Sequence, residues 1–120
     1  MSEEAEVWWT QALRDLETAV YLLSAERFDA VAFFAQQSVE KALKSLHIDR
    51  HKELKKTHDL VLLAKGLDLP PNLLEFCKEL SPAYVYTRYP DVVPVQDIDM
   101  VSKDLLRYAR EIIEWVRKRR

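Results

Sequence analysis

Glycine is almost absent from this chain of 120 residues, which contains one glycine and five prolines. Tight β-hairpin turns need positive φ angles, which glycine adopts more readily than any other residue. The sequence therefore disfavours a sandwich or barrel built from many hairpins. Glycine-rich phosphate loops of the dinucleotide-binding and P-loop types need more than one glycine, so both classes of site are excluded.

Cysteine and long apolar runs are equally scarce. Cys77 is the single cysteine, which excludes an intrachain disulfide and a zinc site made of several thiolates. No apolar stretch approaches the roughly 20 residues that cross a membrane, so we expect no membrane contact. The first residues are acidic and lack the basic start and apolar run of a signal peptide. We therefore expect a cytoplasmic protein.

The charge balance gives no general attraction to nucleic acid, because 18 basic and 20 acidic residues leave a formal net charge of −2. The charges are unevenly spread along the chain. Residues 1–17 are mainly acidic, whereas residues 50–56 and 107–120 are mainly basic. An anionic partner would be met locally, at such basic stretches.

Three long stretches have apolar residues at the i, i+3, i+4 spacing of an amphipathic helix. They lie at about residues 3–24, 29–46 and 98–116. The expected N-caps are Ser2, Asp29, and either Asp97 or Asp99, respectively, since short polar side chains satisfy free amide groups at a helix start. The first two helices are separated by only a few residues, which predicts an antiparallel hairpin.

Two shorter helices are expected between the second and the last long helix. The first would begin after Thr57 as its N-cap and end at Gly66, and the second would begin at Pro71. Pro82 would open one further short turn, and residues 92–95 would be extended. The sequence thus predicts a single domain, 1–120, that is all-α, an up-and-down helical bundle of three long and two short helices.

The first stretch with chemical potential is the polar side of the second helix, within Ala32-Phe-Phe-Ala-Gln-Gln-Ser-Val-Glu-Lys-Ala-Leu-Lys-Ser-Leu46. Periodicity alone favours an ordinary amphipathic helix on which Lys41 and Lys44 are solvated. Alternatively, the two ammonium groups share one face with Gln37 and Glu40 and bind a phosphate together.

The second stretch is Thr57-His58-Asp59-Leu60, at the expected start of a helix. A helix dipole disfavours a protonated imidazole there, which would leave His58 able to accept a proton, whereas Asp59 favours the charged form. The alternative is a capping segment in which both side chains bond to the local backbone, and the sequence alone favours capping.

The third stretch, residues 84–91, places three tyrosines around Arg88 in a segment interrupted by Pro90. Arginine can bind a phosphate through two parallel hydrogen bonds, and a base could stack on Tyr89 or Tyr86. Asp91 would orient the guanidinium. Alternatively, the tyrosine rings close the end of the bundle and Arg88 simply pairs with Asp91.

Two other features carry no predicted site. His47 and His51 are four residues apart, but no carboxylate cluster completes a metal site around them. Trp8 and Trp9 are adjacent, so we expect one to pack in the core and the other to lie at the surface. The sequence thus predicts no metal and no cofactor.

Taken together, the three stretches resemble the HEPN domain, the "higher eukaryotes and prokaryotes nucleotide-binding" helical domain. The resemblance spans essentially the whole chain and is carried by the Gln-Gln-x-x-Glu-Lys-Ala-Leu-Lys helix, the His-Asp-Leu and the Arg-Tyr-Pro-Asp. It implies a bundle that usually forms a homodimer. It also implies a minimal nucleotidyltransferase as partner protein, in many cases within a toxin–antitoxin pair.

Some members of that family are metal-independent ribonucleases in which four to six residues separate an arginine from a following histidine. In this chain Val93, Pro94 and Val95 stand at those positions, and no histidine follows Arg88. The general acid or base of the nuclease is thus missing there, and we expect no catalytic residue. The resemblance assigns nucleotide or RNA-phosphate binding to six residues, Lys41, Lys44, His58, Arg88, Tyr89 and Asp91.

Two alternatives to a nucleotide-binding module stay open. One is a ribonuclease in which Arg88 acts with a His58 supplied across the dimer, which requires the two residues to be close in space. The other is a structural interaction protein without a ligand, which requires neither this proximity nor converging cations.

Overall fold

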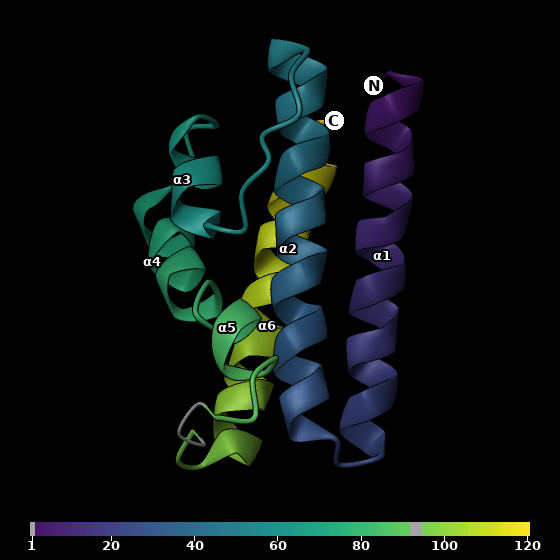
Figure 1. The fold of residues 1–120 in the computed structure, drawn as a ribbon. Helices are drawn as coiled ribbons and strands as arrows, with labels where there is room; N and C mark the ends of the chain where they lie inside the picture. Colours follow the sequence, from purple (N-terminus) through teal and green to yellow (C-terminus); the bar gives the residue numbers. More distant parts are fainter. Residues whose placement is uncertain (1, 92–94) are drawn as a thin grey trace.

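The computed structural model describes residues 2–91 and 95–120, and every regular element in that part of the chain is a helix (Figure 1). The elements are α1 (Glu3–Ser24), α2 (Phe28–His51), α3 (Leu60–Lys65), α4 (Pro71–Leu80), α5 (Ala83–Tyr86) and α6 (Ile98–Arg117). The predicted all-α bundle is confirmed, with α1, α2 and α6 as the long helices and α3 and α4 as the short ones. α5 is the further turn expected after Pro82.

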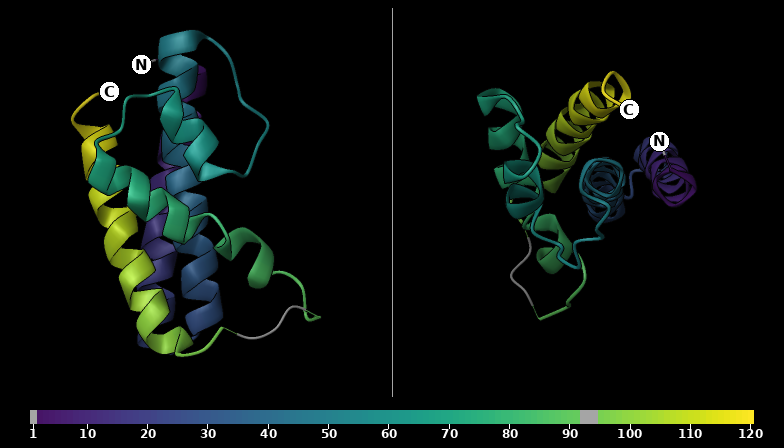
Figure 2. Two further views of the ribbon diagram at one scale, coloured as in Figure 1. Left: turned by 90° about the vertical axis from the view of Figure 1, so that its left-hand side faces the viewer. Right: turned by 90° about the horizontal axis from the view of Figure 1, so that it is seen from above.

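The bundle is arranged around α2. α1 and α2 form the expected antiparallel hairpin, and α6 runs alongside α2 in the same direction, with α3, α4 and α5 between them in the chain (Figure 1). Seen from above, α1 lies outermost, on the side of α2 that faces away from α3 and α4 (Figure 2). α2 consequently packs against α1, α3, α5 and α6.

This central position buries a face of α2 that periodicity assigns to solvent. Gln36, Glu40 and Lys44 are 0%, 3% and 5% exposed, respectively. The expectation of a solvated Lys44 is therefore wrong, because a helix with neighbours on several sides has little surface left for water. Polar groups in such a place need partners inside the protein.

The helix ends differ from the expected caps in two places. α2 begins at Phe28, one residue before its expected cap, and no side chain caps it. α3 is capped by Asp59 and not by Thr57, since the Asp59 carboxylate accepts from the amides of Val61 and Leu62. The cap of α6 is Asp97, as one of the two expectations had it, although its side chain makes no capping hydrogen bond.

Gly66 ends α3 as expected, but with a φ of −81°, in the right-handed region. Its lack of a side chain matters for packing, because a Cβ there would lie 3.2 Å from Nε2 of the buried His47. The extended stretch expected at residues 92–95 lies mostly outside the described residues, as do Val93 and Pro94 of the ribonuclease comparison.

The core holds the residues expected of it. Trp9 is 3% exposed while Trp8 is half-buried, which is the expected division. Cys77 is fully buried, and burial raises the pKa of its thiol to about 12, so the thiol stays protonated and unreactive. Among the described residues, no helix is both long and apolar enough to cross a membrane.

Candidate functional site

Three side chains from two separate segments of the chain meet at the surface around α5. The ring of His58 stacks on the ring of Tyr84, with centroids 3.8 Å apart and planes inclined by 14°. Nη1 of Arg88 donates to the hydroxyl of Tyr84 at 2.6 Å. The guanidinium carbon lies 4.7 Å from the centroid of that tyrosine. We refer to His58, Tyr84 and Arg88 as the Arg88 cluster.

Glu40 of α2 holds the imidazole of His58 from beneath. Nδ1 of His58 lies 3.0 and 3.1 Å from the two carboxylate oxygens of Glu40, whose side chain is 4% exposed. A carboxylate can only accept, so Nδ1 carries the hydrogen and donates it. In the neutral ring Nε2 is then the basic nitrogen, on a side chain that is 51% exposed. His58 can thus exchange a proton with a surface ligand.

Two more side chains of the same helix donate hydrogen bonds to the carboxylate of Glu40. Nζ of Lys44 donates to Oε2 at 2.9 Å, and Nε2 of Gln36 donates to Oε1 at 3.1 Å. These residues lie at successive i, i+4 positions, so one face of α2 presents amide, carboxylate and ammonium in a row. The row compensates the charge of Glu40 in a buried place where an unpaired carboxylate would be costly.

The backbone around His58 is fixed independently of its ring. Gln36 also donates to the carbonyl of His58 at 3.3 Å, and the amide of Leu60 donates to Oγ of Ser81 at 3.1 Å. Asp59 supplies the cap of α3, which leaves the imidazole free of capping. The capping interpretation is therefore correct for Asp59 and wrong for His58.

Lys41 and Lys44 are held in two separate ion pairs. Nζ of Lys41 lies 2.5 Å from Oδ2 of the buried Asp15 in α1, whereas Lys44 pairs with Glu40 and lies 5.5 Å from the centroid of the Trp8 ring. A direct phosphate contact by either lysine stays a prediction, and it requires one of these ion pairs to open. Lys44 is connected to the Arg88 cluster through Glu40, which contacts both Lys44 and His58.

Two open grooves border the cluster. One, of about 440 Å³, is lined by His58, Tyr84 and Lys78 among others. The other, of about 390 Å³, is lined by Arg88, Tyr89, Tyr86 and Asp29 among others, and we name it the Asp29 groove. The structure thus brings three of the predicted residues, His58, Arg88 and Tyr89, to one surface.

Asp91 is exposed next to this surface, but the contacts of Arg88 in the described part of the chain are with tyrosines. The second tyrosine is Tyr89, whose ring centroid lies 6.0 Å from the guanidinium carbon. Tyr84 therefore orients Arg88 in the structure, whereas the sequence suggested that Asp91 would do so. The role of Asp91 in binding stays a prediction.

Sequence reasoning missed Tyr84 and the part played by Glu40. The i, i+4 row of Gln36, Glu40 and Lys44 was visible in the sequence, but such a row is equally common on a solvated helix face and did not indicate burial. The signal for Tyr84 was the i, i+4 spacing to Arg88, which places the two side chains together on one helical turn. Neither spacing reveals that His58 joins them, because that contact depends on how α3 docks.

The arrangement has the groups that an anionic ligand needs. The exposed guanidinium of Arg88 can give a phosphate two parallel hydrogen bonds, and its contact with Tyr84 limits the conformations that must be frozen on binding. His58 adds a second donor when protonated. Among the described residues, no three His, Cys, Asp or Glu side chains gather as a metal site would require.

A comparison with protein families matches the HEPN domain over residues 5–119 of the chain. Among solved structures, TT1696 from Thermus thermophilus is 30% identical with a TM-score of 0.88, over 98% of each chain. ST0689, an archaeal HEPN homologue, is 30% identical with a TM-score of 0.81, over 99% of this chain and 98% of its own.

A third solved structure shows the same fold at lower identity. It is the HEPN domain protein TM0613 from Thermotoga maritima, which is 22% identical with a TM-score of 0.75 over 92% of this chain and 94% of its own. No curated protein matches the chain.

Proposed function

The chain belongs to the HEPN domain family, and from this premise we propose that it is a nucleotide-binding module whose phosphate contact is the Arg88 cluster. The observation that carries the proposal is the stack of His58 on Tyr84 with Arg88 bonded to the Tyr84 hydroxyl. Cationic and aromatic groups side by side at the surface suit a phosphate with a base attached.

The buried partners of the cluster support a function beyond packing. An exposed histidine needs no partner to be stable, yet His58 is anchored to a carboxylate that is itself held by Lys44 and Gln36. Burying a Lys–Glu pair seldom gains more stability than apolar residues of similar volume would. The arrangement is instead what fixes the position and tautomer of an imidazole that meets a ligand.

Family membership supports a wider proposal. The module acts as a homodimer with a minimal nucleotidyltransferase as partner protein, within a toxin–antitoxin pair, in the cytoplasm. The direct test is to co-express the chain with a nucleotidyltransferase encoded beside it and to measure co-elution on a sizing column. A neighbouring gene of another kind, or separate elution of the two proteins, would overturn this part of the proposal.

The phosphate contact is tested by calorimetric titration with nucleoside monophosphates and triphosphates. Arg88→Ala should weaken binding by about 1.5–3 kcal/mol, as expected for hydrogen bonds to a charged group, and Arg88→Lys should recover little because the fork geometry is lost. Arg107→Ala is the matched control, since Arg107 also lies over a tyrosine, Tyr108, but on α6. Equal affinities of wild type and Arg88→Ala would place the site elsewhere.

A second candidate function, a metal-independent ribonuclease, is favoured by one observation. His58 and Arg88 both contact Tyr84 within one protomer, so His58 need not come from a second copy. Nε2 of His58 would take the proton of a ribose 2′-hydroxyl as its oxygen attacks phosphorus. The bond from phosphorus to the 5′ oxygen would break, that oxygen would take a proton from water, and Arg88 would stabilise charge on the phosphate.

This candidate is tested with RNA in the presence of a chelator. Under the leading proposal the RNA stays intact at every pH. Cleavage that is lost in His58→Ala, while that variant still binds nucleotide, would replace the binding function with the nuclease.

A further inference from the structure

We infer that the Asp29 groove is the base-binding part of the site and that it selects guanine nucleotides. This inference rests on the proposed function, because it takes Arg88 as the contact of the phosphate. The groove is lined by Arg88, Tyr89 and Tyr86 and by Asp29 at the start of α2, and its volume of about 390 Å³ lies within the range of small-molecule sites.

The groove offers an aromatic ring next to the phosphate contact. The side chain of Tyr89 is 48% exposed, and its ring centroid lies 6.0 Å from the guanidinium carbon of Arg88. Any base can stack on such a ring, so stacking contributes affinity but no selectivity between bases. Selection between bases has to come from a polar group further along the groove.

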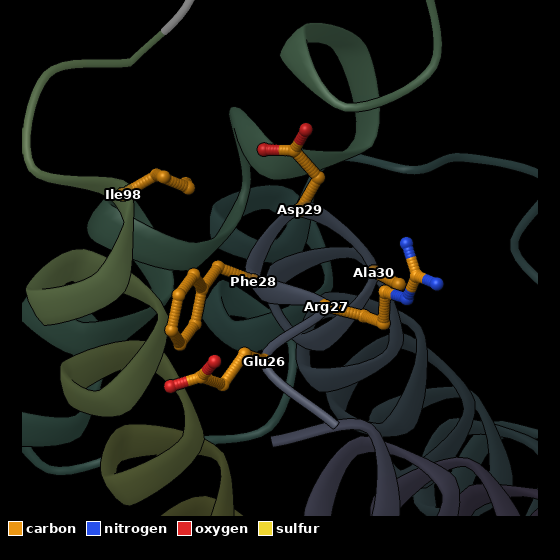
Figure 3. Close-up of a pocket in the computed structure, with 6 residues that line it drawn as sticks. All are labelled: Glu26, Arg27, Phe28, Asp29, Ala30 and Ile98. Carbon is orange, nitrogen blue, oxygen red and sulfur yellow. The ribbon is translucent and has the colours of Figure 1, made fainter. Parts of the chain in front are cut away.

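Asp29 is that polar group. It is exposed, and among the described residues its carboxylate has neither a hydrogen-bond partner nor an ion-pair partner, so its acceptor positions are open. Asp29 also lines an adjoining pocket of about 340 Å³ (Figure 3). There it points away from the Phe28 ring and from Glu26. Asp29 is among the residues that line the groove, and its negative charge, after burial of the phenol, is one cause of the raised pKa of Tyr86, about 12.

An acidic residue in the first turn of α2 also favours the helix dipole, which is the structural reason for Asp29. That role accounts for an acid at this position but not for a groove leading from it to Arg88. The two roles make different predictions, because a dipole contribution affects stability alone whereas a base contact changes which nucleotide binds.

The chemistry of a free carboxylate points to guanine. A carboxylate has two acceptor oxygens, and guanine presents two adjacent donors, N1–H and the N2 amino group, on its Watson–Crick edge. Adenine and cytosine offer an amino group beside an unprotonated ring nitrogen, which a carboxylate repels. Uracil offers one N–H between two carbonyl oxygens, so it fits even less well.

The test measures the affinities of GMP, IMP and AMP by calorimetry. Wild type should bind GMP about tenfold more tightly than AMP, within the discrimination of a good bidentate pair, and IMP, which lacks the amino group, should fall between them. Asp29→Asn should reduce the preference for GMP over AMP to less than about threefold, because the amide has one acceptor fewer for guanine and no longer repels the ring nitrogen of adenine.

Glu26→Gln is the matched control, because it removes the same charge from the adjoining pocket and should keep the preference for GMP. Circular dichroism of each variant checks that the helices remain. Equal affinities for the three nucleotides in wild type, or a preference unchanged in Asp29→Asn, would overturn the inference. In either case an Arg88→Ala variant that still loses binding leaves the proposed function standing, whereas no binding of any nucleotide removes both.

Discussion

At the scale of single residues, the buried His47 has the clearest link between environment and measurable behaviour. Its ring lies at the end of α2, 4.6 Å from the ring of His51 by centroids, and is packed against Gly66. Desolvation lowers the pKa of His47 below 6.5, and the nearby His51 and Lys55 lower it further against the opposing effect of the Glu53 carbonyl. The neutral ring is therefore the form that the fold accommodates.

The stability of the protein should consequently depend on pH through His47. In the unfolded chain the imidazole takes up a proton as the pH falls below 6.5, whereas in the folded chain it resists until a lower pH. At acidic pH the unfolded state then binds more protons than the folded state. The free energy of unfolding is therefore highest, as far as His47 determines it, above about pH 6.5, and it decreases as the pH falls below that value. Urea denaturation between pH 7.5 and 5 measures this decrease, and His47→Gln should reduce it.

The control for this prediction is His51→Gln, at the exposed ring one turn further along α2, which should retain the loss of stability on acidification. If His47→Gln showed the same pH dependence as wild type, other groups would be responsible for it.

At the scale of elements, α1 is attached to α2 by a polar contact as well as by apolar packing. The carboxylate of Asp15 is 4% exposed and accepts from Lys41 of α2 and from Gln11 of its own helix. Because α1 lies outermost and contacts α6 much less than α2, this ion pair lies in its principal interface.

Asp15→Ala should destabilise the protein by about 2–3 kcal/mol, because it leaves the Lys41 ammonium unpaired in a mostly buried place. This loss is at or below the lower end of the range of about 3–5 kcal/mol for breaking a fully buried ion pair, because the Lys41 side chain is 22% exposed and keeps some of its hydration. The double variant Asp15→Leu with Lys41→Met should recover most of this loss, since apolar residues of similar volume need no partner. Chemical denaturation measures both, and a double variant no more stable than Asp15→Ala would contradict the account.

At the scale of the whole molecule, the exposed surface of α1 leaves large apolar side chains uncovered. Tyr21 is 75% exposed, Val7 is 66% exposed and Val20 is 39% exposed. Val20 also lines a groove of about 460 Å³ between α1 and α6, together with Leu13, Leu16 and Ile113. An apolar surface of this kind is typical of a protein interface.

We predict that this face joins two copies in a symmetric homodimer. Tyr21→Asp should convert the dimer to a monomer at micromolar concentration, because a charge in the middle of an interface must lose its water. Light scattering measures the mass. Leu62→Asp is the control, since Leu62 is 48% exposed on α3, away from this face, and should leave the dimer intact. A wild-type monomer would contradict the prediction.

The sequence by itself determined which segments are helical and which motifs are candidates for a site. Apolar spacing along a helix depends only on neighbours in the chain, so α1, α2 and α6 were located, and proline and glycine marked the ends of the shorter helices. The motifs that contain His58 and Arg88 are also local features of the chain. They were enough to indicate the family.

Only the tertiary structure decided which partners these residues have. Periodicity divides a helix into two faces, but it does not say how many other helices surround it, and α2 is buried on the face that carries Glu40 and Lys44. The contact of His58 with Glu40 spans 18 positions in the chain, and that of Lys41 with Asp15 spans 26. Such pairs depend on how helices dock, and docking buries charges in pairs because an isolated buried charge is too costly.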